Sequence, residues 1–239
     1  MLSEISGRDS VAATLLTIKN CDFKGLIPTI VLTGTEYGNL NCFDYNIGYI
    51  KTHQNSGKKI YDPIIIYDLK LWNSLNAKYM SEIINKFGFY SPCIGCHLYT
   101  HILRVPIAKK LGIKNIITGE RINHNGKQKI NQLEYVLNTY NKILKIFNVN
   151  LYAPLKFYNS DDEIKQIIGE KWSESPAQLE CVLSGNYCDK NENITITTNL
   201  IEKYCDDFIY PVGKELLDSI LFGKSKDYNK IVSDILQKI

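Results

Sequence analysis

The sequence lacks several features that would assign it to a particular class of protein. No apolar run among its 239 residues is long enough to span a membrane, and its N-terminus has neither the basic nor the apolar segment of a secretory signal. We therefore expect a cytoplasmic protein with no membrane partner. The Walker pattern G-x-x-x-x-G-K-[ST] is also absent, which excludes a P-loop of that type. No internal repeat, low-complexity segment or linker divides the chain.

A strong net charge is missing as well. The chain has 28 basic and 25 acidic residues and a net charge of +3, which neither indicates nor excludes binding to nucleic acid. Cysteine, in contrast, occurs seven times. In a chain without signs of secretion, cysteines more often bind a metal or take part in catalysis than form disulfides, and the odd number agrees with this interpretation.

The first loop of the sequence has the composition of an anion-binding site. A short apolar start leads into Ser6-Gly7-Arg8-Asp9-Ser10, and a helical pattern follows over residues 11–20. A strand, a glycine-containing loop and a helix present backbone N–H groups to an anion, and Gly7 lets the backbone approach a phosphate closely. Asp9 or Ser10 can cap the helix. The alternative interpretation is a capped helix start with a Ser-Gly turn and no ligand.

Strands and helices alternate along the rest of the chain. Continuous apolar runs predict strands at 26–34, 63–67, 113–118 and 148–155. Helical spacing predicts a short helix at 45–50 and longer helices at 71–87, 98–111, 131–146 and, after a capping box at 160–163, to residue 168. A helical tail is predicted at 199–206, 213–222 and on to the C-terminus.

This alternation predicts an α/β fold with a five-stranded parallel sheet between helices. Ligands of such sheets bind beyond the carboxyl ends of the strands. The first loop, Thr33-Gly34 and Thr118-Gly119-Glu120-Arg121 all lie at predicted carboxyl ends. Residues 122–132 are polar and predict a mobile surface loop.

The pair Cys93-x-x-Cys96 is the strongest local signal. Two thiolates at this spacing can converge on one metal or cluster, and a helix start favours the thiolate form. Zinc would need two further ligands, and a [4Fe-4S] cluster would need at least one more cysteine. The alternatives are a redox pair, haem attachment at a Cys-x-x-Cys-His97 sequence and two buried structural cysteines.

The third ligand is expected in the polar segment 173–188. Cys181 is preferred because it precedes the turn at 183–185, and Cys188 is the alternative. Zinc held by the pair and one histidine remains a lesser option. The remaining cysteines are interpreted as small apolar residues: Cys21, Cys42 and Cys205.

The first loop resembles the PP-loop of the ATP pyrophosphatases, the adenine nucleotide alpha-hydrolase-like superfamily, whose signature is S-G-G-x-D-[ST]. Gly7, Asp9 and Ser10 match the signature, whereas Ile5 and Ser6 replace its first serine and first glycine. Members that thiolate tRNA carry a Cys-x-x-Cys in mid-domain and a third cysteine further on, and several hold a [4Fe-4S] cluster. Two further similarities extend the resemblance to about residue 190: the Thr118-Gly119-Glu120 turn, and Pro154-Leu155 before the acidic pair Asp162-Glu163.

The resemblance implies a PP-loop/HUP-like ATP-binding domain over residues 1–190, with 191–239 as its helical C-terminal extension. It implies three groups of site residues. ATP phosphates with Mg²⁺ would lie on Ser6, Gly7, Arg8, Asp9 and Ser10, with Arg8 and Asp9 as catalytic residues. The adenosine would lie near Thr33 and Gly34, and the phosphates would be bordered by Gly119, Glu120 and Arg121. The cluster would be held by Cys93, Cys96 and Cys181.

The implied activity is that of an adenylating, ATP-dependent sulfurtransferase that thiolates a tRNA base. Its partners would be ATP, tRNA and sulfide or another sulfur donor, and a homodimer is left open. A cationic surface for tRNA is predicted from Lys109, Lys110, Lys114, Lys127 and Lys129. Two alternatives remain: a nucleotide-binding or redox-sensing iron-sulfur protein without adenylation, and a zinc-containing PP-loop ligase that acts on a small molecule.

Overall fold

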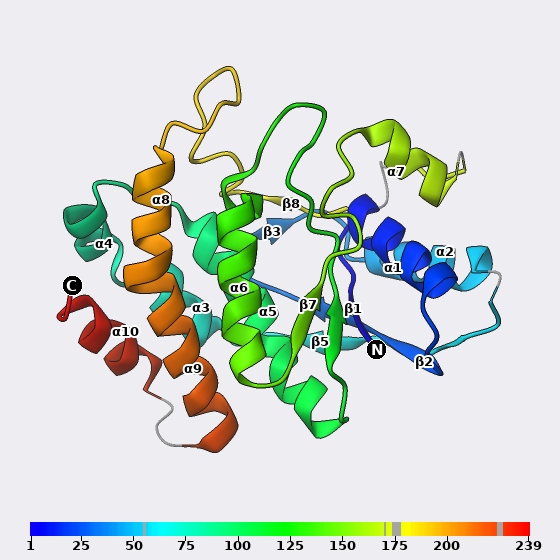
Figure 1. The fold of residues 1–239 in the computed structure, drawn as a ribbon, viewed down its shortest axis with the longest axis horizontal. Helices are drawn as coiled ribbons and strands as arrows, with labels where there is room; N and C mark the ends of the chain where they lie inside the picture. The colour runs from blue at the N-terminus through cyan, green and yellow to red at the C-terminus, as the bar shows by residue number, and fades with distance from the viewer. Residues whose placement is uncertain (55, 170, 174–177, 224–226) are drawn as a thin grey trace.

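A parallel sheet forms the centre of the computed structural model, which describes residues 1–54, 56–169, 171–173, 178–223 and 227–239 (Figure 1). Its strands are β1 (Leu2–Glu4), β2 (Gly25–Val31), β4 (Lys59–Ile60), β5 (Ile64–Ile66), β6 (Asn115–Ile117) and β7 (Asn150–Tyr152). The order is β4-β2-β1-β6-β7, with β5 also paired to β2, and every pairing is parallel. The predicted α/β class with a parallel sheet between helices is confirmed.

The strand number differs slightly from the predicted five. Both β4 and β5 pair with β2, one along Gly25–Leu26 and the other along Thr29–Val31, so together they occupy one edge position. Pro63 lies between them, and a proline cannot donate a hydrogen bond to the neighbouring strand. The edge strand is therefore broken in two, which gives six strands in five positions.

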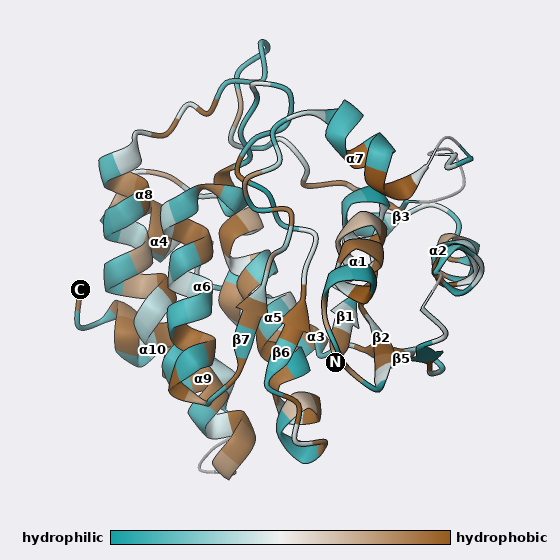
Figure 2. Ribbon diagram, turned by 45° about the vertical axis from the view of Figure 1, so that its right-hand side comes forward, coloured by the Kyte–Doolittle hydropathy of each residue, from teal (hydrophilic) through white to brown (hydrophobic). Residues whose placement is uncertain are grey.

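Helices cover both faces of the sheet. One face packs against α1 (Arg8–Asn20), α2 (Asn41–His53) and α7 (Asp161–Ile168), and the other packs against α3 (Leu69–Asn76), α5 (Pro92–Lys110) and α6 (Glu134–Ile146). Ile116 and Ile117 of β6 enter opposite cores, because successive side chains of a strand point to opposite faces. In Figure 2 the central strands are largely hydrophobic, and the hydrophilic loops lie beyond their carboxyl ends.

The C-terminal tail joins the larger core. It comprises α8 (Thr198–Tyr204), a π-helix (Cys205–Ile209), α9 (Tyr210–Phe222) and α10 (Tyr228–Leu236), and α9 packs against α5 and α6. The π-helix links α8 to α9 without the predicted gap at 207–212. The division of the chain at residue 190 stays a prediction.

Two predicted helices have different bounds in the structure. The predicted helix 71–87 is interrupted between α3 and α4 (Met80–Phe87), where Asn76 is buried against the close-packed Gly95 and its carbonyl accepts a hydrogen bond from Tyr90. The predicted helix 98–111 begins six residues earlier, at Pro92, since proline is favoured in the first turn. Both cysteines of the Cys-x-x-Cys pair therefore lie inside α5.

The loop 122–132 lies at the surface over residues 125–129, as predicted, and is buried at its end. It ends in a 3-10 helix (Ile130–Gln132) whose residues are all buried. Asn131 and Gln132 bond His97 and Glu120, so these two polar side chains point inward. A second small sheet, which the sequence did not predict, pairs β3 (Glu36–Tyr37) with β8 (Glu180–Cys181) in antiparallel fashion.

The close crossing of α9 over α5 and α6 predicts a sensitive position at Gly213. A Cβ there would lie 2.7 Å from Ile143 Cδ1 and 3.2 Å from the methyl groups of Leu98. We expect Gly213→Val to destabilise the protein by about 1–3 kcal/mol through overpacking. The matched control is Gly48→Ala in α2, where nothing lies within 4 Å and helix propensity predicts a gain of about 0.5–1 kcal/mol. Urea unfolding followed by circular dichroism measures both, and equal stability of the two variants would contradict the packing account.

Candidate functional site

A cavity of about 580 Å³ opens at the carboxyl edge of the sheet. It is bounded by the end of β1, the loop after β2, the first turns of α5 and the segment that follows β8. Four of the seven cysteines line it: Cys93, Cys96, Cys181 and Cys188. The helix start therefore faces the same space as a segment almost ninety residues further along the chain, and the ladder between β3 and β8 holds that segment in place.

Three of these sulfur atoms accept hydrogen bonds from N–H groups. Cys96 Sγ accepts from the Trp72 indole at 3.5 Å, and Cys93 Sγ accepts from the Asn186 amide at 3.7 Å. Cys181 Sγ accepts from the backbone N–H of Leu183 at 3.4 Å. Donors of this kind stabilise thiolate ligands and tune the potential of a cluster bound by them.

Burial favours the neutral thiol form of Cys93 and Cys96. Burial raises the pKa of Cys93 to about 11 and that of Cys96 to about 12. A bound metal removes this proton outright, because its positive charge stabilises the thiolate. The position next to α5's N-terminus acts in the same direction.

The sulfur atoms of Cys93, Cys96 and Cys181 do not all lie within 4.8 Å of one another. Within the described residues, the trio of His, Cys, Asp or Glu ligand atoms that all lie within 4.8 Å of one another does not include a cysteine. Around one tetrahedral zinc ion, thiolate sulfurs lie about 3.8 Å apart, given a Zn–S bond of roughly 2.3 Å. At least one of the three sulfur–sulfur distances is therefore longer than in a tetrahedral zinc site.

The predicted phosphate loop touches the cavity only at its edge. Ser6 lines the cavity, whereas Gly7, Arg8, Asp9 and Ser10 do not. Gly7 is the N-cap of α1, so neither Asp9 nor Ser10 takes the N-cap position, although the Ser10 side chain takes part in the cap. Ser10 instead reaches back from the third helical position, and its Oγ accepts hydrogen bonds from the N–H groups of Ser6 at 2.9 Å and Gly7 at 3.2 Å.

A network of four charged side chains fixes this loop. Arg121 is fully buried, and it donates to Asp9 Oδ2 at 2.8 Å and to Asp161 Oδ1 at 2.5 Å. Arg8 donates to the same two carboxylates at 3.1 and 2.8 Å. We call Arg8, Asp9, Arg121 and Asp161 the Arg121 network. His124 connects it to the cavity, because His124 lines the cavity and its Nδ1 lies 3.7 Å from Asp9 Oδ2.

The loop after β6 passes directly over the N-terminus of α1. A Cβ at Gly119 would lie 2.5 Å from the backbone nitrogen of Ser10, so only glycine permits this approach. Gly119, Glu120 and Arg121 do not line the cavity; Gly119 lies against Ser10 and Arg121 bonds Asp9, beside the predicted phosphate loop, and their place next to ATP phosphates stays a prediction. All three residues lie behind the cavity and support its wall.

The carboxylate of Glu36 accepts hydrogen bonds from N–H and hydroxyl groups in the loop after β2. It accepts from the N–H and Oγ1 of Thr33 at 2.8 and 2.7 Å and from the N–H of Gly34 at 2.9 Å. Thr33 and Glu36 line the cavity, whereas Gly34, at φ +81°, does not. The sequence analysis missed Glu36, which lies five residues after the end of β2.

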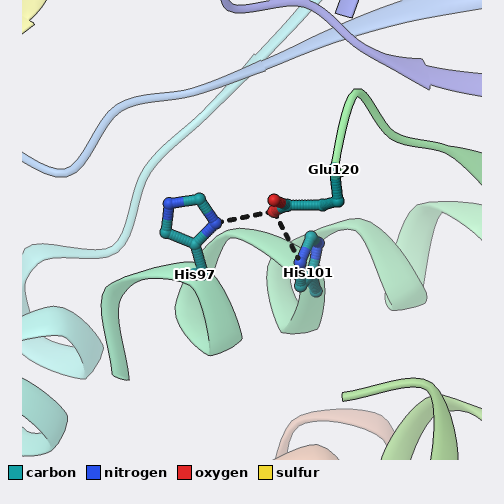
Figure 3. Close-up of side chains that lie close together, drawn as sticks. All are labelled: His97, His101 and Glu120. Atoms are coloured by element: carbon teal, nitrogen blue, oxygen red, sulfur yellow. Dashed lines mark hydrogen bonds and ion pairs between the residues drawn. The ribbon is translucent and has the colours of Figure 1, made fainter. Parts of the chain in front are cut away.

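Behind the cavity, two histidines of α5 converge on Glu120 (Figure 3). His97 Nδ1 lies 2.7 Å and His101 Nε2 lies 3.6 Å from Glu120 Oε1. Burial would raise the pKa of Glu120, but the charges of the two histidines and the hydrogen bond from His97 lower it well below its usual range. Gln132 holds the other carboxylate oxygen at 2.5 Å, and Asn131 contacts His97 Nε2 at 2.9 Å.

The predicted lysine surface is divided. Lys127 and Lys129 line the cavity. Lys109 and Lys110 lie at the opposite end of α5 from Cys93, which a rise of about 1.5 Å per residue places more than 20 Å away. Lys114 precedes β6 at that same far edge. Two of the five lysines are therefore placed to meet a ligand of the cavity.

The fold and the site define an α/β protein with a doubly wound parallel sheet and a thiol-lined cavity at its carboxyl edge. The chain is 43% identical over 220 residues to the uncharacterized protein MJ0009 of Methanocaldococcus jannaschii, an alignment that covers 90% of this chain and 79% of that protein. The chain belongs to the family of this archaeal protein. No family model matches the sequence.

Among solved structures, the chain is similar to a 4-thiouridine synthetase in a crystal structure of its complex with RNA and bound ATP. The TM-score is 0.48 and the sequence identity 15%. The alignment covers 90% of this chain and 53% of that one, so this chain spans about half the length of the synthetase.

The Arg121 network predicts an acid-sensitive contribution to stability. Partial burial would raise the pKa of Asp161, but its hydrogen bond with Arg121 and the charge of Arg8 lower it below 3.8. A carboxyl whose pKa is depressed by folding stabilises the protein above its unfolded pKa, and this contribution is lost as the pH falls through the folded pKa.

We therefore expect Asp161→Asn to be less stable than wild type at pH 7, with a smaller loss of stability between pH 5 and pH 2. The matched control is Asp162→Asn, the exposed neighbour in the same helical turn, which should retain the wild-type pH dependence. Urea midpoints at each pH measure the effect. If the stability of Asp161→Asn depended on pH as that of wild type does, the assigned role of the Asp161–Arg121 ion pair would be contradicted.

Proposed function

We propose that the protein is an ATP-dependent sulfurtransferase that adenylates a tRNA base and replaces the activated oxygen with sulfur, using a [4Fe-4S] cluster on Cys93, Cys96 and Cys181. The observation that carries the proposal is the single cavity in which three hydrogen-bonded thiols meet the edge of the first loop. A sulfur-delivering centre and a nucleotide site need this proximity, because the activated base must reach both.

The donor set fits an iron-sulfur cluster. Three thiols face one space, each accepts an N–H hydrogen bond, and at least one of their sulfur–sulfur distances is longer than in a tetrahedral zinc site. Cys181 is chosen for the third position because its sulfur accepts a hydrogen bond from the Leu183 N–H and the ladder between β3 and β8 holds its backbone. With three protein ligands, one iron of such a cluster is open to an external sulfide.

The first loop and the N-terminus of α1 would bind the phosphates of ATP. The N–H groups of Ser6 and Gly7 donate hydrogen bonds to Ser10 Oγ. A phosphate oxygen would accept these hydrogen bonds in place of the serine hydroxyl. Mg²⁺ would compete with Arg8 for Asp9 Oδ1. Once released from this oxygen, the Arg8 guanidinium would stabilise negative charge on the phosphates.

The chemistry then follows from the two halves of the site. The carbonyl oxygen of the base attacks the α-phosphorus of ATP, and pyrophosphate leaves. Sulfide attacks the activated carbon, the C–O bond breaks, and AMP departs with the oxygen. Lys127 and Lys129 at the cavity would contact RNA phosphates near the reacting base.

Iron content tests the ligand set. We expect anaerobically reconstituted wild type to hold about four irons per chain, and Cys93→Ala, Cys96→Ala and Cys181→Ala to lose most of them. The matched controls are Cys21→Ala and Cys42→Ala, which lie outside the cavity and should retain the iron. Loss of iron in Cys188→Ala together with retention in Cys181→Ala would refute the assigned third ligand. Tight uptake of zinc but not iron by these thiols would favour the small-molecule ligase.

The reaction itself is tested by anaerobic incubation of the reconstituted protein with ATP, sulfide and unmodified tRNA. We expect a thiolated nucleoside by mass spectrometry of the digested RNA, and none with Cys96→Ala. Charge reversal of Lys127 and Lys129 should reduce the salt dependence of tRNA binding without changing ATP binding. Absence of a thiolated product on every tRNA, with the cluster intact, would contradict the proposed substrate.

A further inference from the structure

His101 is the least satisfied polar side chain near the cavity. Its ring is fully buried in α5, and neither nitrogen makes a hydrogen bond within the described residues. Leaving such groups unpaired costs free energy comparable to a lost hydrogen bond, so a buried histidine of this kind requires an explanation. Its Nε2 faces Glu120 Oε1 at 3.6 Å, which is beyond hydrogen-bond distance but within an ion's reach (Figure 3).

Three ligand atoms converge at this point. One nitrogen each of His97 and His101 and one oxygen of Glu120 all lie within 4.8 Å of one another. The two histidines are four residues apart, so they lie on the same face of α5. Ligand atoms about 2.0–2.2 Å from a zinc ion lie roughly 3.0–3.5 Å from one another, so small side-chain movements would bring this trio into place.

We propose that His97, His101 and Glu120 form a binding site for one divalent transition-metal ion. Two imidazoles and a carboxylate are ligands typical of Zn²⁺ or Fe²⁺, and three protein ligands leave a further position for water or substrate. His97 lines the cavity while the other two side chains lie behind it. The ion would therefore enter from the cavity, and its open position would face that space.

The surroundings of the trio have the features of a supported metal site. Gln132 Nε2 donates to Glu120 Oε2 and leaves Oε1 for the ion. Asn131 contacts the second nitrogen of His97 at 2.9 Å; with its amide turned so that the oxygen accepts, it would fix His97 to coordinate through Nδ1. A hydrogen-bonded outer shell of this kind orients metal-binding histidines and carboxylates.

This site contains no cysteine, so it holds whether or not the protein is a sulfurtransferase. The test is a calorimetric titration of Zn²⁺ into metal-free protein. The protein carries the substitutions Cys93→Ser, Cys96→Ser and Cys181→Ser, which remove the proposed cluster ligands. We expect this variant to bind one Zn²⁺ per chain. Adding His101→Gln or Glu120→Gln should weaken binding at least about tenfold, a loss typical even of outer-shell changes. The matched control is His53→Gln, an exposed histidine on α2, which should leave the affinity unchanged.

A spectroscopic measurement covers the case in which the His101 variant fails to fold. X-ray absorption is measured for the cysteine variant and for wild type, each loaded with one equivalent of Zn²⁺. In the variant, the zinc ion should have a first coordination shell of nitrogen and oxygen atoms. Loss of Zn²⁺ binding in the cysteine variant, or equal affinity with and without His101→Gln, would overturn the proposal. Failure of iron-sulfur assembly in wild type would refute the proposed function and leave this result unaffected.

Discussion

The geometry of the site depends on the ion pairs that the buried guanidinium of Arg121 makes with two carboxylates. A fully buried charge is tolerated only where opposite charges and hydrogen bonds compensate its lost hydration, and Asp9 and Asp161 supply both. These carboxylates belong to α1 and α7, so one side chain from the loop after β6 joins three elements. Gly119 makes the joint compact, because its missing Cβ lets that loop rest on the backbone of Ser10.

The cavity follows from this joint and from the order of the strands. β1 lies between β2 and β6 in the sheet. The chain continues from β1 to β2 on one side, and β6 is added later on the other side. The crevice between these two connections opens at the carboxyl edge of the sheet. The first turn of α5 brings Cys93 and Cys96 to this crevice, and the β3–β8 ladder brings Cys181. One space thus receives a helix N-terminus, a set of thiols and His97.

Features set by neighbouring residues were predictable from the sequence, and features set by distant contacts were not. The capping box at Ser160 and Glu163, the buried strands and the Cys-x-x-Cys pair depend on local spacing, and they were found. The break before α4 involves the contact with Gly95, and the burial of Gln132 involves its bond to Glu120; no local pattern reveals either contact. The convergence of His101 on Glu120 was missed for the same reason, although the shared helix face of His97 and His101 was visible.

The central claim is that the first loop activates an oxygen by adenylation, and the products formed from ATP test it most directly. Phosphorus NMR of anaerobic reactions that contain the protein, ATP, Mg²⁺ and unmodified tRNA distinguishes cleavage at the α-phosphorus from cleavage at the γ-phosphorus. The account predicts AMP and pyrophosphate in equal amounts, with formation dependent on tRNA. ADP and inorganic phosphate as the products, or ATP that remains intact, would contradict it.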